Sequence, residues 1–483
     1  MKRLIPILIF SICISYPIFA QKTSDALRFT PYSFNGVGAR ALSMGSAYIA
    51  VSDDYTALFW NPAGLAQMKR LEFTGSISNL GYSNTSTFYG NSLTANGTST
   101  TINDLGFVFP FPTAQGSLVF SFGYNKIADF ASGLSFSGFN PTGSIIPSLL
   151  DSDTDYNIPY WVYLTNSIGD FSLIKDSVNQ RAITKESGSM GMWSLAGAID
   201  IEENVSLGVT LNIISGKYIF DRNYVEEDTR NVYSDTLPKL PWNQAYYRFN
   251  KFYYDSHTEM GITGSSFTIG FMYRADLYRI GAIVRTPQVV TVKHTYSRAG
   301  QSVFDAPKND SAWVGGIEPQ KKTYSYDSYY DFGVISPWNF GIGASFYPIP
   351  DLLLSADIDY SDWSQIEWSQ DADLKKENIT LQSNFKGIIS YRVGAEFNVP
   401  STDLRLRGGY SLKPSPYKND PSSFDQQTIS GGAGILLQRN ILIDAGVRLG
   451  SVKTTINQYA DASSRVNQSI STTNVTVTLS YRF

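Results

Sequence analysis

The sequence predicts an all-β protein, a transmembrane antiparallel β-barrel of about fourteen strands with an N-terminal hatch, or plug, inside it. Three observations predict this fold. Apolar residues recur at every second position along most of the chain after residue 70, and only 17% of the residues are charged whereas 14% are aromatic. The chain also begins with an apolar export signal. An aromatic-rich outer face over a polar lumen is typical of outer-membrane barrels.

Residues 1–20 have the layout of a secretory signal peptide. Lys2 and Arg3 precede an apolar run over residues 4–19, and Ala20 stands before the polar Gln21. This run is shorter than the roughly 20 residues that a membrane-spanning helix needs, so a signal peptide is favoured over an anchor. We therefore expect cleavage after Ala20 and export from the cytoplasm, and the mature chain would then contain no cysteine.

Residues 21–69 differ from the rest and are predicted to form the hatch. They are rich in small residues and contain the run Asn61-Pro62-Ala63-Gly64. An asparagine side chain can bond to nearby backbone and proline fixes φ, so this run predicts a tight turn. A compact insert fits this composition better than a pair of long strands.

Residues 70–483 are predicted to form the barrel, because period-two alternation recurs there. The expected strands are 70–80, 100–110, 115–126, 190–201, 204–219, 265–275, 278–294, 336–348, 351–366, 386–398, 402–412, 427–438, 441–454 and 470–483. Short and long connections alternate between them, which is the plan of short periplasmic turns and long external loops. A soluble β-sandwich is the alternative, but its outward face should be polar, whereas here the apolar face is aromatic.

Several motifs resemble those of one family. They are the run 36–40, Met44-Gly45, Asp53-Asp54, the run 61–65, and the strand segments 357–364, 391–396 and 404–410. Together they resemble the FadL/TodX-type outer-membrane transporters of Gram-negative cells. The resemblance implies a fourteen-stranded barrel plugged by the hatch, and passive outer-membrane transport of long-chain fatty acids or hydrocarbons. It also implies that Asn61, Pro62, Ala63 and Gly64 shift during transport, although simple plug packing would explain them equally.

The resemblance leaves alternatives and departs from the family at one point. PorV-like relatives share a similar hatch and barrel but act as scaffolds that bind secreted proteins or a secretion complex. A simple porin is a third option, which a plug disfavours. About fifteen residues, 21–35, precede the hatch motif here, so the family's position for the extreme N-terminus cannot be carried over.

The alternation assigns side chains to the two faces of the wall. It places Arg279, Arg285, Arg392, Arg405 and Arg407 in the lumen. Because guanidinium groups match carboxylates, these arginines are candidates to bind the head group of an acidic ligand. The alternative is a ladder of structural ion pairs that braces the hatch.

Two further features bear on a hydrophobic ligand. Residues 123–138, at the end of the third strand, are rich in glycine and aromatics, and in the family a kink there opens a lateral exit into the membrane. A glycine-permitted bend or an ordinary loop would both fit. The aromatic-rich loops 127–189, 220–264 and 295–335 could capture an amphipathic ligand.

The remaining expectations concern partners and chemistry. The expected partners are a hydrophobic small molecule or lipid, outer-membrane lipids, and the barrel assembly machinery, whose recognition signal the C-terminal Phe483 resembles. Lys plus Arg total 38 against 42 for Asp plus Glu, a balance that argues against a nucleic-acid partner. With 2 histidines, no Gly-x-Ser-x-Gly elbow and no phosphate loop, we expect no enzyme, no catalytic residue, no metal site and no cofactor.

Overall fold

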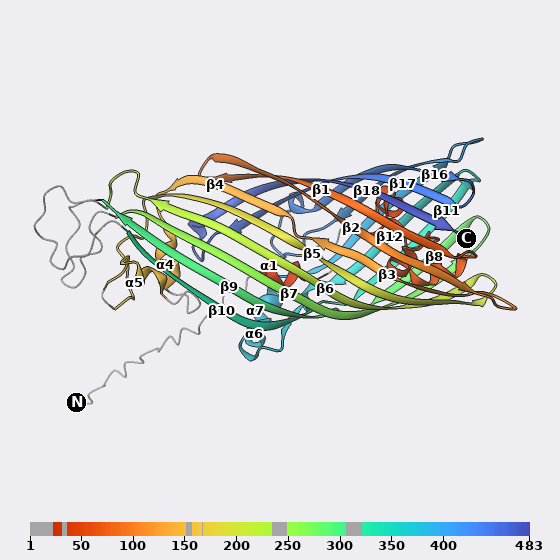
Figure 1. Cartoon of the computed structure of the whole chain (residues 1–483), viewed down its shortest axis with the longest axis horizontal. Coiled ribbons are helices and arrows are strands. Elements are labelled where there is room, and N and C mark those ends of the chain that lie inside the picture. Colours follow the sequence, from red (N-terminus) through yellow and green to blue (C-terminus); the bar gives the residue numbers. More distant parts are fainter. Residues whose placement is uncertain (1–22, 31–35, 151–156, 167, 234–248, 306–320) are drawn as a thin grey trace, which may run out of the picture.

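The computed structural model describes residues 23–30, 36–150, 157–166, 168–233, 249–305 and 321–483. The predicted signal peptide lies outside the described residues. The chain forms one closed antiparallel sheet, in which β1 pairs with both β2 and β18 (Figure 1). Four of the wall strands are each split into two segments, so the named β segments make up a barrel of 14 strands. The predicted fold class is confirmed.

The wall consists of long strands at one side and shorter strands at the other. The segments are β1 Glu72–Phe88, β2 Asn91–Phe111, β3 Leu118–Asp129, β4 Ser132–Asn140, β5 Val178–Glu202, β6 Val205–Glu227, β7 Phe249–Arg274, β8 Tyr278–Arg285, β9 Val289–Phe304, β10 Lys321–Ile335, β11 Asn339–Ile349, β12 Leu352–Asp362, β13 Glu367–Ser369, β14 Gly387–Asn398, β15 Leu404–Lys413, β16 Gln426–Leu437, β17 Ile441–Asn457 and β18 Arg465–Arg482. The split strands are β3/β4, β8/β9, β10/β11 and β12/β13.

Short helices lie inside the barrel and around its ends. They are α1 Thr23–Arg28, α2 Ala39–Ser43, α3 Ala57–Trp60, η2 Pro62–Gln67, α4 Ile145–Leu150, α5 Ile158–Trp161, η4 Trp363–Gln365, α6 Ala372–Lys376, α7 Asn378–Ser383, η5 Ser422–Phe424 and η6 Ala462–Ser464. Helices α2, α3 and η2 form the hatch, near the barrel end that holds the C-terminus, whereas α4 and α5 lie at the opposite end (Figure 1). Within the described ranges, no helix has the length and apolarity needed to cross a membrane.

The alternation of faces is confirmed on β12. Leu354 and Ile358 are 42% and 45% exposed on the outside of the barrel, whereas Asp357 and Asp359 are 2% and 6% exposed on the inside. The same contrast recurs around the wall, which has exposed large apolar side chains outside and buried polar ones inside. Such a surface suits a lipid environment.

Several predicted strands were too short, and the missing residues lie toward the barrel end opposite the C-terminus. β5 begins at residue 178 instead of 190, β7 at 249 instead of 265, and β6 ends at 227 instead of 219. These extensions carry polar side chains on the outer face, so the apolar alternation fades although the hydrogen-bonded ladder continues. Apolar residues at every second position reveal only the part of a strand that has an apolar face, and these strands continue beyond that part.

The predicted long connection between the first two strands was wrong. β1 and β2 are joined by Tyr89 and Gly90, whose φ angles of 45° and 84° are those of a tight primed hairpin turn. Serine, threonine and asparagine occupy both faces of the flanking segments, which hides the strands from a test of apolar alternation.

Candidate functional site

The hatch turn is bound to the wall through Asn61. Its side chain accepts a hydrogen bond from the Ala63 amide at 3.1 Å and donates to the carbonyls of Ile49 at 2.9 Å and Phe271 at 3.0 Å. The first bond caps η2, the second closes the hatch on itself, and the third reaches β7. Pro62 supplies the first position of η2, where its missing N–H is harmless. Asn61, Pro62, Ala63 and Gly64 are all buried, and their movement stays a prediction.

Glycines in the wall let the hatch backbone touch the barrel. A Cβ at Gly270 would lie 2.2 Å from the Asn61 side-chain oxygen, and one at Gly409 would lie 2.1 Å from the Gly45 amide nitrogen. Similar close approaches to the hatch occur at Gly208, Gly281, Gly343, Gly394, Gly432 and Gly446. Only glycine, which has no Cβ, permits such contacts. The hatch therefore requires glycine at these positions of the wall.

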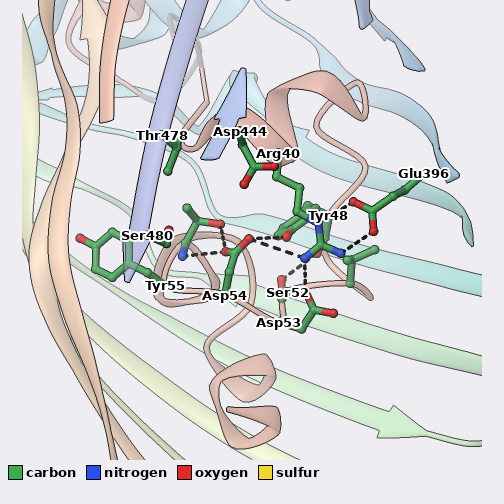
Figure 2. Close-up of polar contacts among 12 residues, drawn as sticks. Arg40, Tyr48, Ser52, Asp53, Asp54, Tyr55, Glu396, Asp444, Thr478 and Ser480 are labelled. Carbon is green, nitrogen blue, oxygen red and sulfur yellow. Dashed lines mark hydrogen bonds and ion pairs between the residues drawn. The ribbon is translucent and has the colours of Figure 1, made fainter. Parts of the chain in front are cut away.

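A buried ion-pair network clamps the hatch to the C-terminal half of the wall. The guanidinium of Arg40 on α2 donates two hydrogen bonds of 2.8 Å to Glu396 on β14 and also pairs with Asp53 (Figure 2). Glu396 in turn accepts from Arg407 at 2.6 Å. Burial would raise the pKa of Asp53, but Arg40 and Arg279 hold it below its ordinary value. Paired in this way, the charges brace the plug.

The structure separates the five predicted lumenal arginines into three groups. Arg279 pairs with Asp53 at 3.3 Å and Arg407 pairs with Glu396 and Asp444, so both belong to the bracing network. Arg405 lies near the start of β15, away from the cavity described below. Arg285 and Arg392 line that cavity. Ligand binding by any of the five stays a prediction.

A cavity of about 160 Å³ lies between the hatch and the wall. Phe59 and Trp60 of the hatch form part of its apolar lining, together with Ile127, Met192 and Trp363. Among the described residues that line it, the cationic ones are Arg285, Arg392, Lys413 and Arg448, and the acidic one is Asp359. The site is therefore amphipathic, with an excess of positive charge.

Two of the cavity cations also hold the protein together. Arg285 donates to the carbonyls of Phe59 at 3.3 Å and Trp60 at 3.4 Å, at the C-terminal end of α3. Arg392 forms an ion pair with Asp359. Lys413 was not singled out from the sequence, although it has the same strand parity as Arg405 and could have been found by that signal.

The wall has a seam beside the third strand. β2 and β3 are hydrogen-bonded only from Asp104–Phe111 to Leu118–Asn125, and β4 then pairs with β5 alone. In place of a ladder, Ser99 donates to Asp129 at 3.1 Å and Asn91 donates to the Ser137 carbonyl at 3.2 Å. The break at residues 130–131 falls within the predicted interval 123–138. A lateral exit there stays a prediction.

The end of the barrel opposite the hatch is covered by a packed cap. Helices α4 and α5 form an apolar cluster with the ends of several strands, and Trp161 stacks on Tyr324 with ring centroids 5.3 Å apart. Parts of the three predicted capture loops lie outside the described residues, namely 151–156, 167, 234–248 and 306–320. Much of the described part of these intervals is strand and not loop, since it belongs to β4, β5, β6, β7, β9 and β10. Ligand capture by the aromatic side chains of these intervals stays a prediction.

The fold and the plug together define a class, the hatch-bearing β-barrels. Three solved structures show the same fold: the Pseudomonas putida toluene transporter TodX (TM-score 0.55, 13% identity, covering 93% of this chain and 99% of that one), a Pseudomonas aeruginosa FadL homologue (0.55, 12%, 93% and 99%) and the Ralstonia pickettii toluene transporter TbuX (0.51, 16%, 94% and 100%). No curated protein sequence matches the chain.

The family follows from the sequence match. Residues 183–483, more than half of the chain, match the model of the outer membrane protein transport protein family (OMPP1/FadL/TodX). The chain belongs to this family, as its motifs predicted. It is an outer-membrane protein, and its family is one of transport channels.

Proposed function

We propose that this barrel carries amphipathic molecules with an apolar tail and an anionic head, of which long-chain fatty acids are the simplest, passively across the outer membrane. The observation that carries the proposal is the lumenal cavity. It brings four cations and one carboxylate together with the apolar side chains of Phe59 and Trp60. Clefts of one charge sign with low-dielectric walls concentrate ligands of the opposite charge.

The charge of the cavity is our reason to favour one class of ligand over another. TodX and TbuX are named as toluene transporters. A neutral hydrocarbon can form no ion pair or charge-assisted hydrogen bond with the four cations that line the cavity, whereas a carboxylate can. A carboxylate or similar head group would match the charge of this cavity, so we favour an anionic amphiphile over a neutral hydrocarbon for this chain.

The seam between β2 and β4 supports a sideways path for the tail. The part of β2 before Asp104 is joined to the β3/β4 strand by side-chain hydrogen bonds in place of a backbone ladder. Each such bond contributes about 0.5–1.5 kcal/mol net, so the seam opens at lower cost than a paired strand edge. An apolar molecule that leaves there enters the lipid phase directly.

The test is uptake of radiolabelled palmitate by cells that lack the gene and carry either the wild type or the variant Lys413→Gln/Arg448→Gln. These two cations are chosen because their replacement leaves in place the hydrogen bonds from Arg285 to the hatch and the ion pair of Arg392 with Asp359. Charged hydrogen bonds contribute about 1.5–3 kcal/mol, so we expect uptake by the variant to fall by at least tenfold. Lys217→Gln, which removes an exposed cation of β6 that pairs with Glu259 at 2.7 Å, is the control.

Other results would redirect the proposal. Uptake of toluene that is equal in wild type and variant, with no palmitate uptake, would indicate a neutral-hydrocarbon channel. No uptake of either compound, with folded barrel at the surface and secreted proteins co-purifying, would support the scaffold role.

The seam is tested by Asn91→Cys/Ser137→Cys, because the mature chain is expected to have no other cysteine. The disulfide should block palmitate uptake, and reduction should restore it.

A further inference from the structure

Helix α1 lies in the lumen, upstream of the hatch motif. Ala26 and Phe29 have no exposed surface and Leu27 is 6% exposed. The Phe29 ring lies among three aromatic side chains, with its centroid 6.0 Å from that of Tyr218 and 6.3 Å from those of Phe130 and Phe332. These partners come from the break between β3 and β4, from β6 and from β10. The N-terminal segment therefore fills the middle of the barrel.

Polar contacts of Arg28 also hold α1 in place. The Arg28 guanidinium lies over the Tyr218 ring at 4.5 Å from its centroid, and its Nη2 atom is 3.9 Å from the Glu186 carboxylate. Arg28 also pairs with Asp25 within the helix. Ala26, Leu27 and Phe29 belong to a large apolar cluster that also includes hatch side chains such as Ala41 on α2 and Trp60 on α3.

The apolar cluster around α1 extends to the wall of the cavity. Ile127, Met192, Trp363 and Ile388 line the cavity and also belong to the cluster that encloses α1. The cavity itself measures about 160 Å³, whereas sites for small organic ligands usually measure about 300–1,000 Å³. It has room for a head group beside the cations and too little room for a long tail.

We propose that α1 occupies the tail-binding half of the ligand site, and that a ligand with a long apolar tail binds only when α1 leaves it. This inference rests on the proposed function. Phe29 serves as an internal stand-in for part of the tail, and its contact with Phe130 holds α1 against the inner side of the seam. Ligand binding and seating of α1 then exclude each other. The apparent affinity is therefore the intrinsic affinity multiplied by the fraction of molecules in which α1 is not seated.

Binding of radiolabelled palmitate to the purified full-length mature protein in lipid nanodiscs tests this competition. Phe29→Gln places a polar amide among aromatic rings and disfavours the seated helix without adding a charge that would repel palmitate. We expect its apparent affinity to rise by about tenfold or more, as it must if α1 is seated in nine molecules of ten. Phe111→Gln, at an exposed phenylalanine at the end of β2, is the matched control and should bind as the wild type does.

A second variant keeps α1 in place. Phe29→Cys/Phe332→Cys, bridged by bis-maleimidoethane, should lose palmitate binding, and the unbridged protein should retain it. Unchanged or weaker binding by Phe29→Gln, or full binding by the bridged protein, would overturn the α1 proposal and leave the transport function intact. Absence of palmitate binding in the wild type, in Phe29→Gln and in the unbridged protein alike would overturn the proposed function itself, and this inference with it.

Discussion

Replacing Asn61 by alanine should open the periplasmic end of the barrel. The change removes the bond that caps η2 and the two bonds to the carbonyls of Ile49 and Phe271. Loss of an N-cap costs about 0.5–2 kcal/mol, and each buried carbonyl left without its donor adds about 1 kcal/mol or more. The closed hatch should therefore lose roughly 3 kcal/mol relative to an open one.

This loss can be measured as a change in opening frequency. A difference of 1.4 kcal/mol is tenfold in an equilibrium constant, so about 3 kcal/mol corresponds to roughly a hundredfold more opening events. Single-channel recording in planar bilayers counts such events directly. Hydrogen exchange of the amides in residues 57–67 should accelerate in parallel, because their protection depends on the closed hatch.

Asn157→Ala is the matched control for this experiment. Asn157 also caps a short proline-containing helix, since its side chain accepts from the Tyr160 amide at 3.2 Å and donates to the Gly169 carbonyl at 2.8 Å. It lies in the cap at the other end of the barrel, so its loss should leave the opening frequency unchanged. An opening frequency in Asn61→Ala that equals the wild-type value, with a folded barrel, would refute the view that this turn latches the hatch.

Three further predictions concern the contact between hatch and wall. Gly409→Ala should destabilise the plugged barrel by about 1–3 kcal/mol, because the new Cβ would meet the hatch backbone at 2.1 Å, whereas Gly408→Ala, with its nearest atom at 4.0 Å, should be neutral in thermal unfolding. Arg40→Met should cost about 3–5 kcal/mol by leaving Glu396 with one arginine fewer, and the additional change Glu396→Gln should recover part of that loss in a double-mutant cycle. Burial acts to raise the pKa of Asp53, but the paired arginines hold that pKa below its ordinary value of 3.8. The ionised Asp53 therefore stabilises the closed hatch fully above pH 3.8, and this stabilisation is lost as the pH falls through the lower pKa of the folded state. Channel opening should rise in that acidic range, and Asp53→Asn should remove this pH dependence.

The barrel could be predicted from the sequence because its signal is local. A strand between lipid and lumen must alternate, and Asp357 and Asp359 are inward for the same reason that Leu354 and Ile358 are outward. The strand extensions beyond the apolar belt could not be predicted, because no lipid constrains their outer face. The tight turn at Tyr89 and Gly90 was missed for the same reason.

The site was predicted only in part, because it depends on register between distant segments. Parity placed Arg407 in the lumen correctly, but only the structure shows that Arg407 meets Glu396 and Asp444 while Arg392 faces the cavity. Helix α1 is six residues long, too short for a periodic signal. Its position follows from where Phe29 finds aromatic partners, in the break between β3 and β4, on β6 and on β10, which no local pattern encodes.

The distribution of bonds around the hatch favours a sideways path over removal of the whole plug. Hatch amides donate to Thr478 on β18, Ser430 on β16 and Asp357 on β12, at distances of 2.7 to 3.0 Å, and the turn is bonded to β7. Displacing the plug as one body would break these bonds together with the buried ion pairs, and separating one buried pair alone costs about 3–5 kcal/mol. Opening the seam breaks side-chain hydrogen bonds of about 0.5–1.5 kcal/mol each between neutral groups, and of about 1.5–3 kcal/mol each where the Lys126 ammonium donates to Ser78 and Thr101. In the proposed path the cation-rich cavity binds the head group, α1 leaves its position and the seam opens for the tail. We therefore infer that ligand passage needs only a local movement of the hatch.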